Sequence, residues 1–163
     1  MTVLPRVLAV VRDGIADGLH LGAQVYVSRH GGVVADIAAG IAAPGLPLET
    51  DTLLLWQSCT KPLVAAAAAR LMERGLLDVE DPVARHIPEF GNHGKEAVTI
   101  RHILTHTAGF RYVMLRWFSQ TWQMNFERLC DCPLEPGWAP GEKAGYHSAA
   151  SWFILSEVLR RLD

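Results

Sequence analysis

The sequence is poor in cysteine, in net charge and in long apolar runs, and each shortage excludes a class of protein. Its three cysteines, Cys59, Cys130 and Cys132, are odd in number and lack the second pair of a zinc site, so neither a disulfide framework nor structural zinc is expected. Fifteen basic against seventeen acidic residues give a net charge of −2, which argues against nucleic acid or a membrane as a partner. No apolar run reaches the roughly 18 residues that a membrane helix needs.

The N-terminal stretch also lacks the pattern of a secretory signal. It begins Met1-Thr2-Val3-Leu4-Pro5-Arg6 and soon meets charged residues. A signal has a basic start, an uninterrupted apolar stretch and a small-residue cleavage site. We therefore expect the chain as given to be cytoplasmic, with free thiols in a reducing compartment.

What is present indicates a folded globular domain. Half of the 163 residues are apolar and five are Trp, which excludes an intrinsically disordered chain. The length by itself suggests one domain.

The apolar pattern predicts a helix, then a β-hairpin, then helices and loops, which is the α+β class. A lone hairpin is marginal in water, so it needs further strands, and none is recognisable later in the chain. Residues 148–162 and 23–37 are therefore expected either to expose apolar surface or to be covered by a partner segment. The predicted elements are a helix over 3–19, strands over 23–28 and 33–37, a loop over 40–52, a short buried run over 53–56, a helix over 61–74, an irregular stretch over 76–88, a helix over 99–104 capped at Thr99, partial helix over 111–130, and a helix over 148–162.

Ser58-Cys59-Thr60-Lys61 is the candidate for nucleophilic chemistry, because Ser-x-x-Lys places both side chains on one face of a helix. Pro62 is tolerated only in a first turn, so the helix should start near Ser58 or Cys59. The Ser58 hydroxyl and backbone N–H would then lie at the positive end of the helix dipole, where an oxyanion is stabilised. Apolar neighbours would help Lys61 to act as a base. The alternative is that Ser58 only caps the helix and Lys61 is solvated.

With three further stretches, the chain resembles the N-terminal part of the serine β-lactamase-like family. That family comprises class C β-lactamases, penicillin-binding proteins, and esterases and acyltransferases of the same fold. The stretches that carry the resemblance, in the family's order and spacing, are Ser58 to Lys61, Gly75 to Phe90, Val98-Thr99-Ile100-Arg101-His102-Ile103-Leu104-Thr105-His106-Thr107-Ala108-Gly109, and Pro140-Gly141-Glu142 leading to Tyr146-His147-Ser148.

The resemblance implies roles for individual residues. Ser58 is the expected acylated nucleophile, Lys61 its proton partner, and Tyr146 the second proton carrier, since a nearby cation stabilises a phenolate. Tyr26-Val27-Ser28 matches the same Tyr-x-Ser pattern, but only Tyr146 follows the Pro/Gly lead-in. Ser148 stands where many class C β-lactamases carry Asn, which favours an esterase or acyltransferase.

Substrate contacts are expected from Ser148, Tyr112 and Trp138, on an ester, amide or β-lactam. No cofactor is implied. His102 and His106 are four residues apart, but Ile103 replaces the Glu of a zinc-protease helix, so no metal is expected either.

The family's third motif, a strand that lines the pocket, is not found in the sequence. The resemblance therefore implies that residues 1–163 are the N-terminal portion of a single β-lactamase/transpeptidase-like domain whose C-terminal sheet strands are absent. Three alternatives remain open at this point. The chain is an active serine hydrolase, a catalytically incomplete fragment or half of a split protein completed by a second polypeptide, or a sensor that is acylated but turns over slowly.

Overall fold

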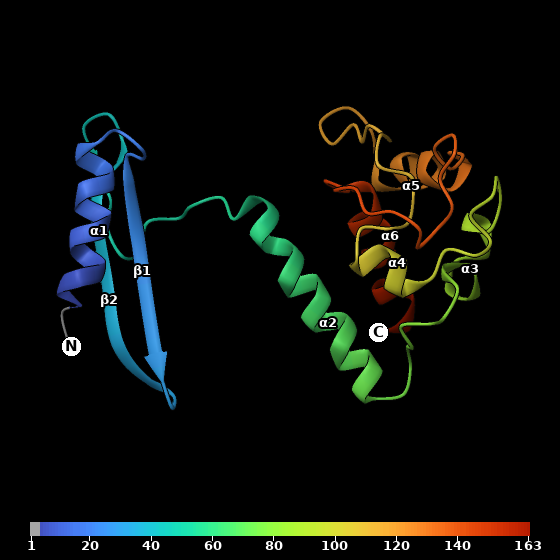
Figure 1. Cartoon of the computed structure of the whole chain (residues 1–163), viewed down its shortest axis with the longest axis horizontal. Helices are drawn as coiled ribbons and strands as arrows, with labels where there is room; N and C mark the ends of the chain where they lie inside the picture. The colour runs from blue at the N-terminus through green and yellow to red at the C-terminus, as the bar shows by residue number, and fades with distance from the viewer. Residues whose placement is uncertain (1–3) are drawn as a thin grey trace. The chain divides into compact units, whose positions relative to one another are not determined.

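Residues 4–163 are described by a computed structural model, which divides into two compact units, Met1–Leu55 and Trp56–Asp163 (Figure 1). Each unit is described separately. Among residues 4–163, no helix combines the length and the apolar character needed to cross a membrane.

The first unit is a helix packed on a small antiparallel sheet (Figure 1). Helix α1 (Pro5–Ala16) starts with Pro5 in its first turn, where the missing N–H costs nothing. Strands β1 (Gly22–Arg29) and β2 (Gly32–Ala43) form the predicted hairpin, and β3 (Leu46–Pro47) completes the sheet in the order β1-β2-β3. Val3, the first residue of the predicted helix, lies outside the described residues.

The predicted loop over 40–52 is wrong at its start, because β2 continues to Ala43 and pairs with β3 (Leu46–Pro47). Gly40, where the predicted loop begins, lies within β2. Its φ is +90°, and a Cβ there would lie 2.2 Å from the Leu21 carbonyl oxygen. The glycine therefore permits a close approach between strands rather than ending one.

The second unit is helical, and its last helix lies at the centre. The elements are the 3₁₀ turn η1 (Gln57–Thr60), α2 (Lys61–Glu73), α3 (Val83–His86), η2 (Pro88–Phe90), α4 (Ile100–Leu104), α5 (Trp122–Asp131) and α6 (Ala150–Leu162). Helix α6 packs against α2, α3, α4 and α5, and its residues Ile154, Leu155 and Val158 are fully buried.

Three expectations about burial and local structure need correction. Helices of the same unit bury most apolar residues of 148–162 and leave Trp152, Leu159 and Leu162 half-buried, whereas Tyr26 on β1 stays 64 % exposed. The run over 53–56 is not buried within its own unit, since Leu53 and Leu55 are 96 % and 87 % exposed. The stretch over 76–88 contains α3, because Pro82 stands at its N-cap and starts the helix rather than breaking it.

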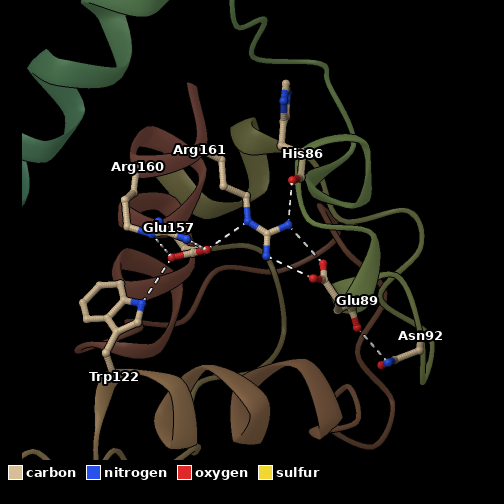
Figure 2. A network of polar contacts seen from close by, with 7 residues as sticks. All are labelled: His86, Glu89, Asn92, Trp122, Glu157, Arg160 and Arg161. Atoms are coloured by element: carbon tan, nitrogen blue, oxygen red, sulfur yellow. Dashed lines mark hydrogen bonds and ion pairs between the residues drawn. The ribbon is translucent and has the colours of Figure 1, made fainter. Parts of the chain in front are cut away.

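A buried carboxylate ties α6 to its neighbours (Figure 2). Glu157 accepts hydrogen bonds from Trp122 Nε1 at 3.2 Å, Arg160 at 2.8 Å and Arg161 at 2.9 Å. Arg161 also pairs with Glu89 and with a backbone carbonyl of α3. The Arg160 hydrogen bond above all lowers the pKa of Glu157 to about 2. Arg161 thus anchors α6 to the segment over 86–89, whereas, among the described residues, Arg160 bonds only within α6.

A buried lysine closes the end of α5. The Lys95 side chain is fully buried, and its Nζ donates to the Cys130 carbonyl at 3.0 Å, to Asn92 Oδ1 at 2.9 Å and to the Cys132 carbonyl. A cation at a helix C-terminus satisfies carbonyls that have no partner within the helix. Burial lowers the pKa of Lys95 and raises that of the Cys130 thiol to about 12.

Candidate active site

Ser58 lies in a turn that leads directly into α2. The structure places it in the 3₁₀ turn η1, with α2 beginning at Lys61 and Pro62 in its first turn. Gln57, immediately before it, has a φ of +49°, a left-handed conformation that non-glycine residues rarely adopt and that recurs at functional sites. Within the described residues the Ser58 N–H finds no hydrogen-bond acceptor, so it remains able to donate to a substrate.

Three side chains predicted from sequence motifs meet at one oxygen atom. Lys61 Nζ lies 3.0 Å from Ser58 Oγ, and Tyr146 OH lies 2.6 Å from the same Oγ. The Lys61 ammonium lies 5.0 Å from the centre of the Tyr146 ring and 5.9 Å from that of Trp152. We call Ser58, Lys61 and Tyr146 the Ser58 cluster.

The electrostatics of the Ser58 cluster favour loss of the Tyr146 proton. The pKa of the phenol is lowered, first by its polar contact with the Lys61 ammonium and then by the hydrogen bond to Ser58. A phenolate 2.6 Å from the Ser58 hydroxyl is positioned to accept its proton. The cluster therefore brings together a hydroxyl, a phenol of lowered pKa and a cation.

His106 holds Tyr146 in place by accepting hydrogen bonds from the residues immediately before and after it in the chain. Its carbonyl accepts from the Gly145 N–H at 2.9 Å, and its Nδ1 accepts from the His147 N–H at 3.1 Å. Its ring lies 4.9 Å from the Tyr146 ring, centre to centre. Burial first, and then Lys61, lowers the pKa of His106, which keeps Nδ1 unprotonated and able to accept. The spacing of His102 and His106 suggests at most a metal site, and no signal in the sequence indicates this position of His106 beside Tyr146.

The loop that carries His106 is fixed by a glycine and a buried histidine. Gly109 has a φ of +87°, and a Cβ there would lie 2.3 Å from the Trp138 ring. His147 Nε2 accepts from the backbone N–H groups of Gly109 and Phe110 at 3.1 and 3.3 Å. Burial lowers the pKa of His147 to about 4, so it stays neutral in this role. The loop after α4 and the segment around Tyr146 are therefore joined by several hydrogen bonds.

Thr99 caps α4 as predicted, and His102 completes a capping box with it. The two residues exchange hydrogen bonds, from the His102 N–H to Thr99 Oγ1 and from the Thr99 N–H to His102 Nδ1. The Nδ1 atom of His102 is thus engaged in capping the start of α4. Residues 4–163 contain no cluster of three or more His, Cys, Asp or Glu side chains suited to hold a metal ion.

The other predicted contact residues lie in different surroundings. Ser148 is exposed and lines a cavity together with Lys61. Tyr112 is 77 % exposed and packs against the Arg111 guanidinium, 4.6 Å from the ring centre. Trp138 is buried, and its Nε1 donates to the Thr107 carbonyl at 3.0 Å. The structure therefore brings only Ser148 next to the Ser58 cluster, and substrate contact by all three remains a prediction.

Comparison with known protein families identifies the family that carries this arrangement of residues. The family described as Beta-lactamase matches residues 7–163. The chain belongs to the beta-lactamase family. Esterase EstB of Burkholderia gladioli is 33 % identical, in an alignment that covers 96 % of this chain and 44 % of the esterase. Esterase/beta-lactamase LipL of Mycobacterium tuberculosis is 38 % identical over 85 % of this chain and 33 % of the relative.

Solved structures agree with the family assignment and confirm the expected fold. A penicillin-binding protein homologue from Caulobacter crescentus superposes with a TM-score of 0.83 at 32 % identity, covering 96 % of this chain and 43 % of that protein. A family VIII carboxylesterase also gives 0.83, at 30 % identity, covering 99 % of this chain and 45 % of the carboxylesterase. The chain thus spans less than half the length of these relatives, and it contains part of the beta-lactamase fold.

Proposed function

We propose that the protein is a serine hydrolase that cleaves a small ester through an acyl intermediate on Ser58. One observation carries the proposal: Ser58 Oγ is within hydrogen-bond distance of both Lys61 Nζ and Tyr146 OH. The similarity to proteins named as esterases supports an ester as substrate. Ser148, in place of the Asn of many class C β-lactamases, also favours an ester over a β-lactam.

In the first half-reaction, the Tyr146 phenolate takes the proton of the Ser58 hydroxyl while Oγ attacks the ester carbonyl carbon. The Lys61 ammonium stabilises the phenolate before this transfer. The Ser58 N–H donates to the developing oxyanion. The ester C–O bond then breaks, and Tyr146 passes its proton to the leaving alkoxide, which departs as the alcohol.

In the second half-reaction, water attacks the acyl-Ser58 carbonyl. Tyr146, again a phenolate, takes a proton from the water and returns one to Ser58 Oγ as the acid leaves. Microscopic reversibility assigns the same groups to both halves. An alcohol in place of water would give acyl transfer by the same steps.

The experiment compares Ser58→Ala with Cys59→Ala in the full gene product. Cys59 is the adjacent residue, exposed and with a free thiol, so its variant controls for local disturbance and for a thiol nucleophile. Ser58→Ala should lower kcat/KM for p-nitrophenyl acetate at least about 10³-fold and abolish labelling by a fluorophosphonate. Cys59→Ala should change neither measurement appreciably. Unchanged hydrolysis by Ser58→Ala would overturn the proposal.

The same labelling tests the alternative that residues 1–163 are catalytically incomplete. If the full gene product is labelled and the 163-residue chain is not, the reaction needs residues outside this chain. With p-nitrophenyl acetate, one equivalent of p-nitrophenol released without further turnover, and an acetyl group that persists on Ser58, would identify a slow-turnover sensor instead.

A further inference from the structure

The Lys61 ammonium lies close to two aromatic rings. Its Nζ is 5.0 Å from the centre of the Tyr146 ring and 5.9 Å from that of the Trp152 ring. Among residues 4–163, no carboxylate forms an ion pair with this ammonium. A cation within about 6 Å of a ring centre is attracted to the negative face of the ring. Trp152 therefore supplies Lys61 with an attraction that no anionic side chain of the described residues supplies.

The same indole lies beside the other residue that holds Tyr146. The rings of Trp152 and His106 are 5.7 Å apart, centre to centre. His106 in turn accepts hydrogen bonds from the two residues that flank Tyr146. One side chain thus lies against both Lys61 and His106, the two groups that act on the Tyr146 phenol.

The start of α6 determines where this indole lies. Trp152 is the third residue of α6, and its neighbours Ala150, Ser151 and Phe153 are buried. A side chain on a packed helix is placed more precisely than one on a loop. Lys61, by contrast, carries its charge at the end of a flexible four-carbon stem. The indole is therefore the rigid partner, and the ammonium is the group that it restrains.

We propose that Trp152 is a positioning residue that holds the Lys61 ammonium against Ser58 and Tyr146. The inference rests on the proposed function, because Trp152 acts on the activation of Ser58 only through Lys61. It predicts that a ring at position 152 matters for the reaction although this ring touches neither the attacking oxygen nor its proton.

Loss of the ring should change the pH dependence of Ser58 acylation. Lys61 lowers the pKa of Tyr146, so an ammonium that moves away into water lets this pKa rise. The phenolate is the reacting form, so the acid limb of the profile, where the rate increases with pH, then moves to higher pH. A cation–π attraction at a partly exposed site corresponds to a shift of about 0.4 to 0.7 pH unit.

Three other ionisable groups lie near Tyr146. Cys59 on η1 acts on the phenol in the opposite direction to Lys61. His147 stays neutral, because burial lowers its pKa to about 4. Burial first, and then Lys61, lowers the pKa of His106, so His106 would respond to a displaced ammonium in the same direction as Tyr146. The experiment therefore has to separate His106 from Tyr146.

The test measures the rate of fluorophosphonate labelling, and kcat/KM for p-nitrophenyl acetate, from about pH 5 to pH 10 with the full gene product. Trp152→Leu removes the ring and keeps an apolar side chain. Trp152→Phe keeps a ring and removes no hydrogen bond, since Trp152 Nε1 has no acceptor within residues 4–163. Trp117→Leu is the matched control, because Trp117 lines the same cavity as Trp152 but packs against Phe153 instead of the ammonium.

Trp152→Leu should move the acid limb of both profiles up by about 0.5 unit, which is about threefold in rate on the acid side. Trp152→Phe should move it less than half as far, and Trp117→Leu should leave it in place whatever its effect on kcat/KM. In a His106→Asn background, which has no imidazole to titrate, the shift caused by Trp152→Leu should persist. If leucine prevents folding, Trp152→Met, which also lacks a ring, takes its place with the same expectation.

Four results would overturn the role of Trp152 while leaving the hydrolase proposal intact. They are an acid limb that stays in place in the ringless variant, an equal shift in Trp152→Phe, an equal loss of rate at every pH, and a shift that disappears in the His106→Asn background. The proposed function itself fails if the unchanged protein cleaves no ester and Ser58 takes no fluorophosphonate label.

Discussion

Replacing His106 by Phe tests whether the position of Tyr146 depends on one side-chain nitrogen. Phe keeps a ring beside Tyr146 but removes Nδ1, the acceptor of the His147 N–H at 3.1 Å. His147 is fully buried, so its N–H loses its partner without gaining water. A buried donor left without an acceptor costs about 1 to 3 kcal/mol. The left-handed φ of +60° at this position, which a bulky Phe tolerates less well than His, adds to the cost. The chain relieves both by moving the segment that carries Tyr146.

The expected effect on the reaction follows from that energy. A change of 1.36 kcal/mol is tenfold in rate, so about 1 to 3 kcal/mol corresponds to roughly 5- to 150-fold. A displacement of about 1 Å in a catalytic group can cost about 100-fold, which agrees with the upper end of this range. We therefore expect His106→Phe to slow fluorophosphonate labelling of Ser58 between about 10- and 100-fold.

The control is His106→Asn, which offers an amide oxygen as acceptor near the position of Nδ1 and tolerates the φ of +60° at this residue. It should retain most of the labelling rate, although it loses the ring. Both variants are measured for the labelling rate, for kcat and KM with p-nitrophenyl acetate, and for Tm. The reasoning is refuted if folded His106→Phe labels at the rate of the unchanged protein, or if His106→Asn is equally slow.

Three further predictions concern stability, each measured by urea unfolding of the full gene product. The pKa of Glu157 is about 2 in the fold against 4.5 unfolded, so its charge contributes up to about 3 kcal/mol above pH 4.5, lost as the pH falls towards 2. Glu157→Gln should remove that pH dependence, and an equally steep acid loss in the variant would contradict this assignment. Gly109→Ala should destabilise by about 2 kcal/mol or more, because the left-handed φ and the Trp138 ring both oppose a Cβ; a change below 0.5 kcal/mol would show that the loop relaxes. Lys95→Met should cost about 2 to 4 kcal/mol, since buried carbonyls of Cys130 and Cys132 lose their donor; unchanged stability would mean that water replaces the ammonium.

Local patterns in the sequence were sufficient to predict those elements that depend on interactions between residues close together in the chain. Thr99 caps α4 by bonding to a backbone group three residues away, and the hairpin over β1 and β2 follows from β-rich runs around a short turn. Ser58 and Lys61 meet because their spacing of three residues places them on the same face of a helical turn. Burial was less predictable from composition. The apolar segment over 53–56 is exposed, and helix α6 is covered by its own unit, because burial depends on which elements pack together.

The sequence by itself determined the family motifs, the Ser58–Lys61 pair and the α+β order of elements, since these depend on spacings along the chain. Only the tertiary structure decided that Tyr146, 88 residues from Ser58, lies within 2.6 Å of it. It also decided that His106 binds the residues on either side of Tyr146, and that Trp117, Trp122 and Phe153 enclose a cavity beside Lys61. Such contacts join residues far apart in the chain, and they exist only because packing around α6 brings their backbones together.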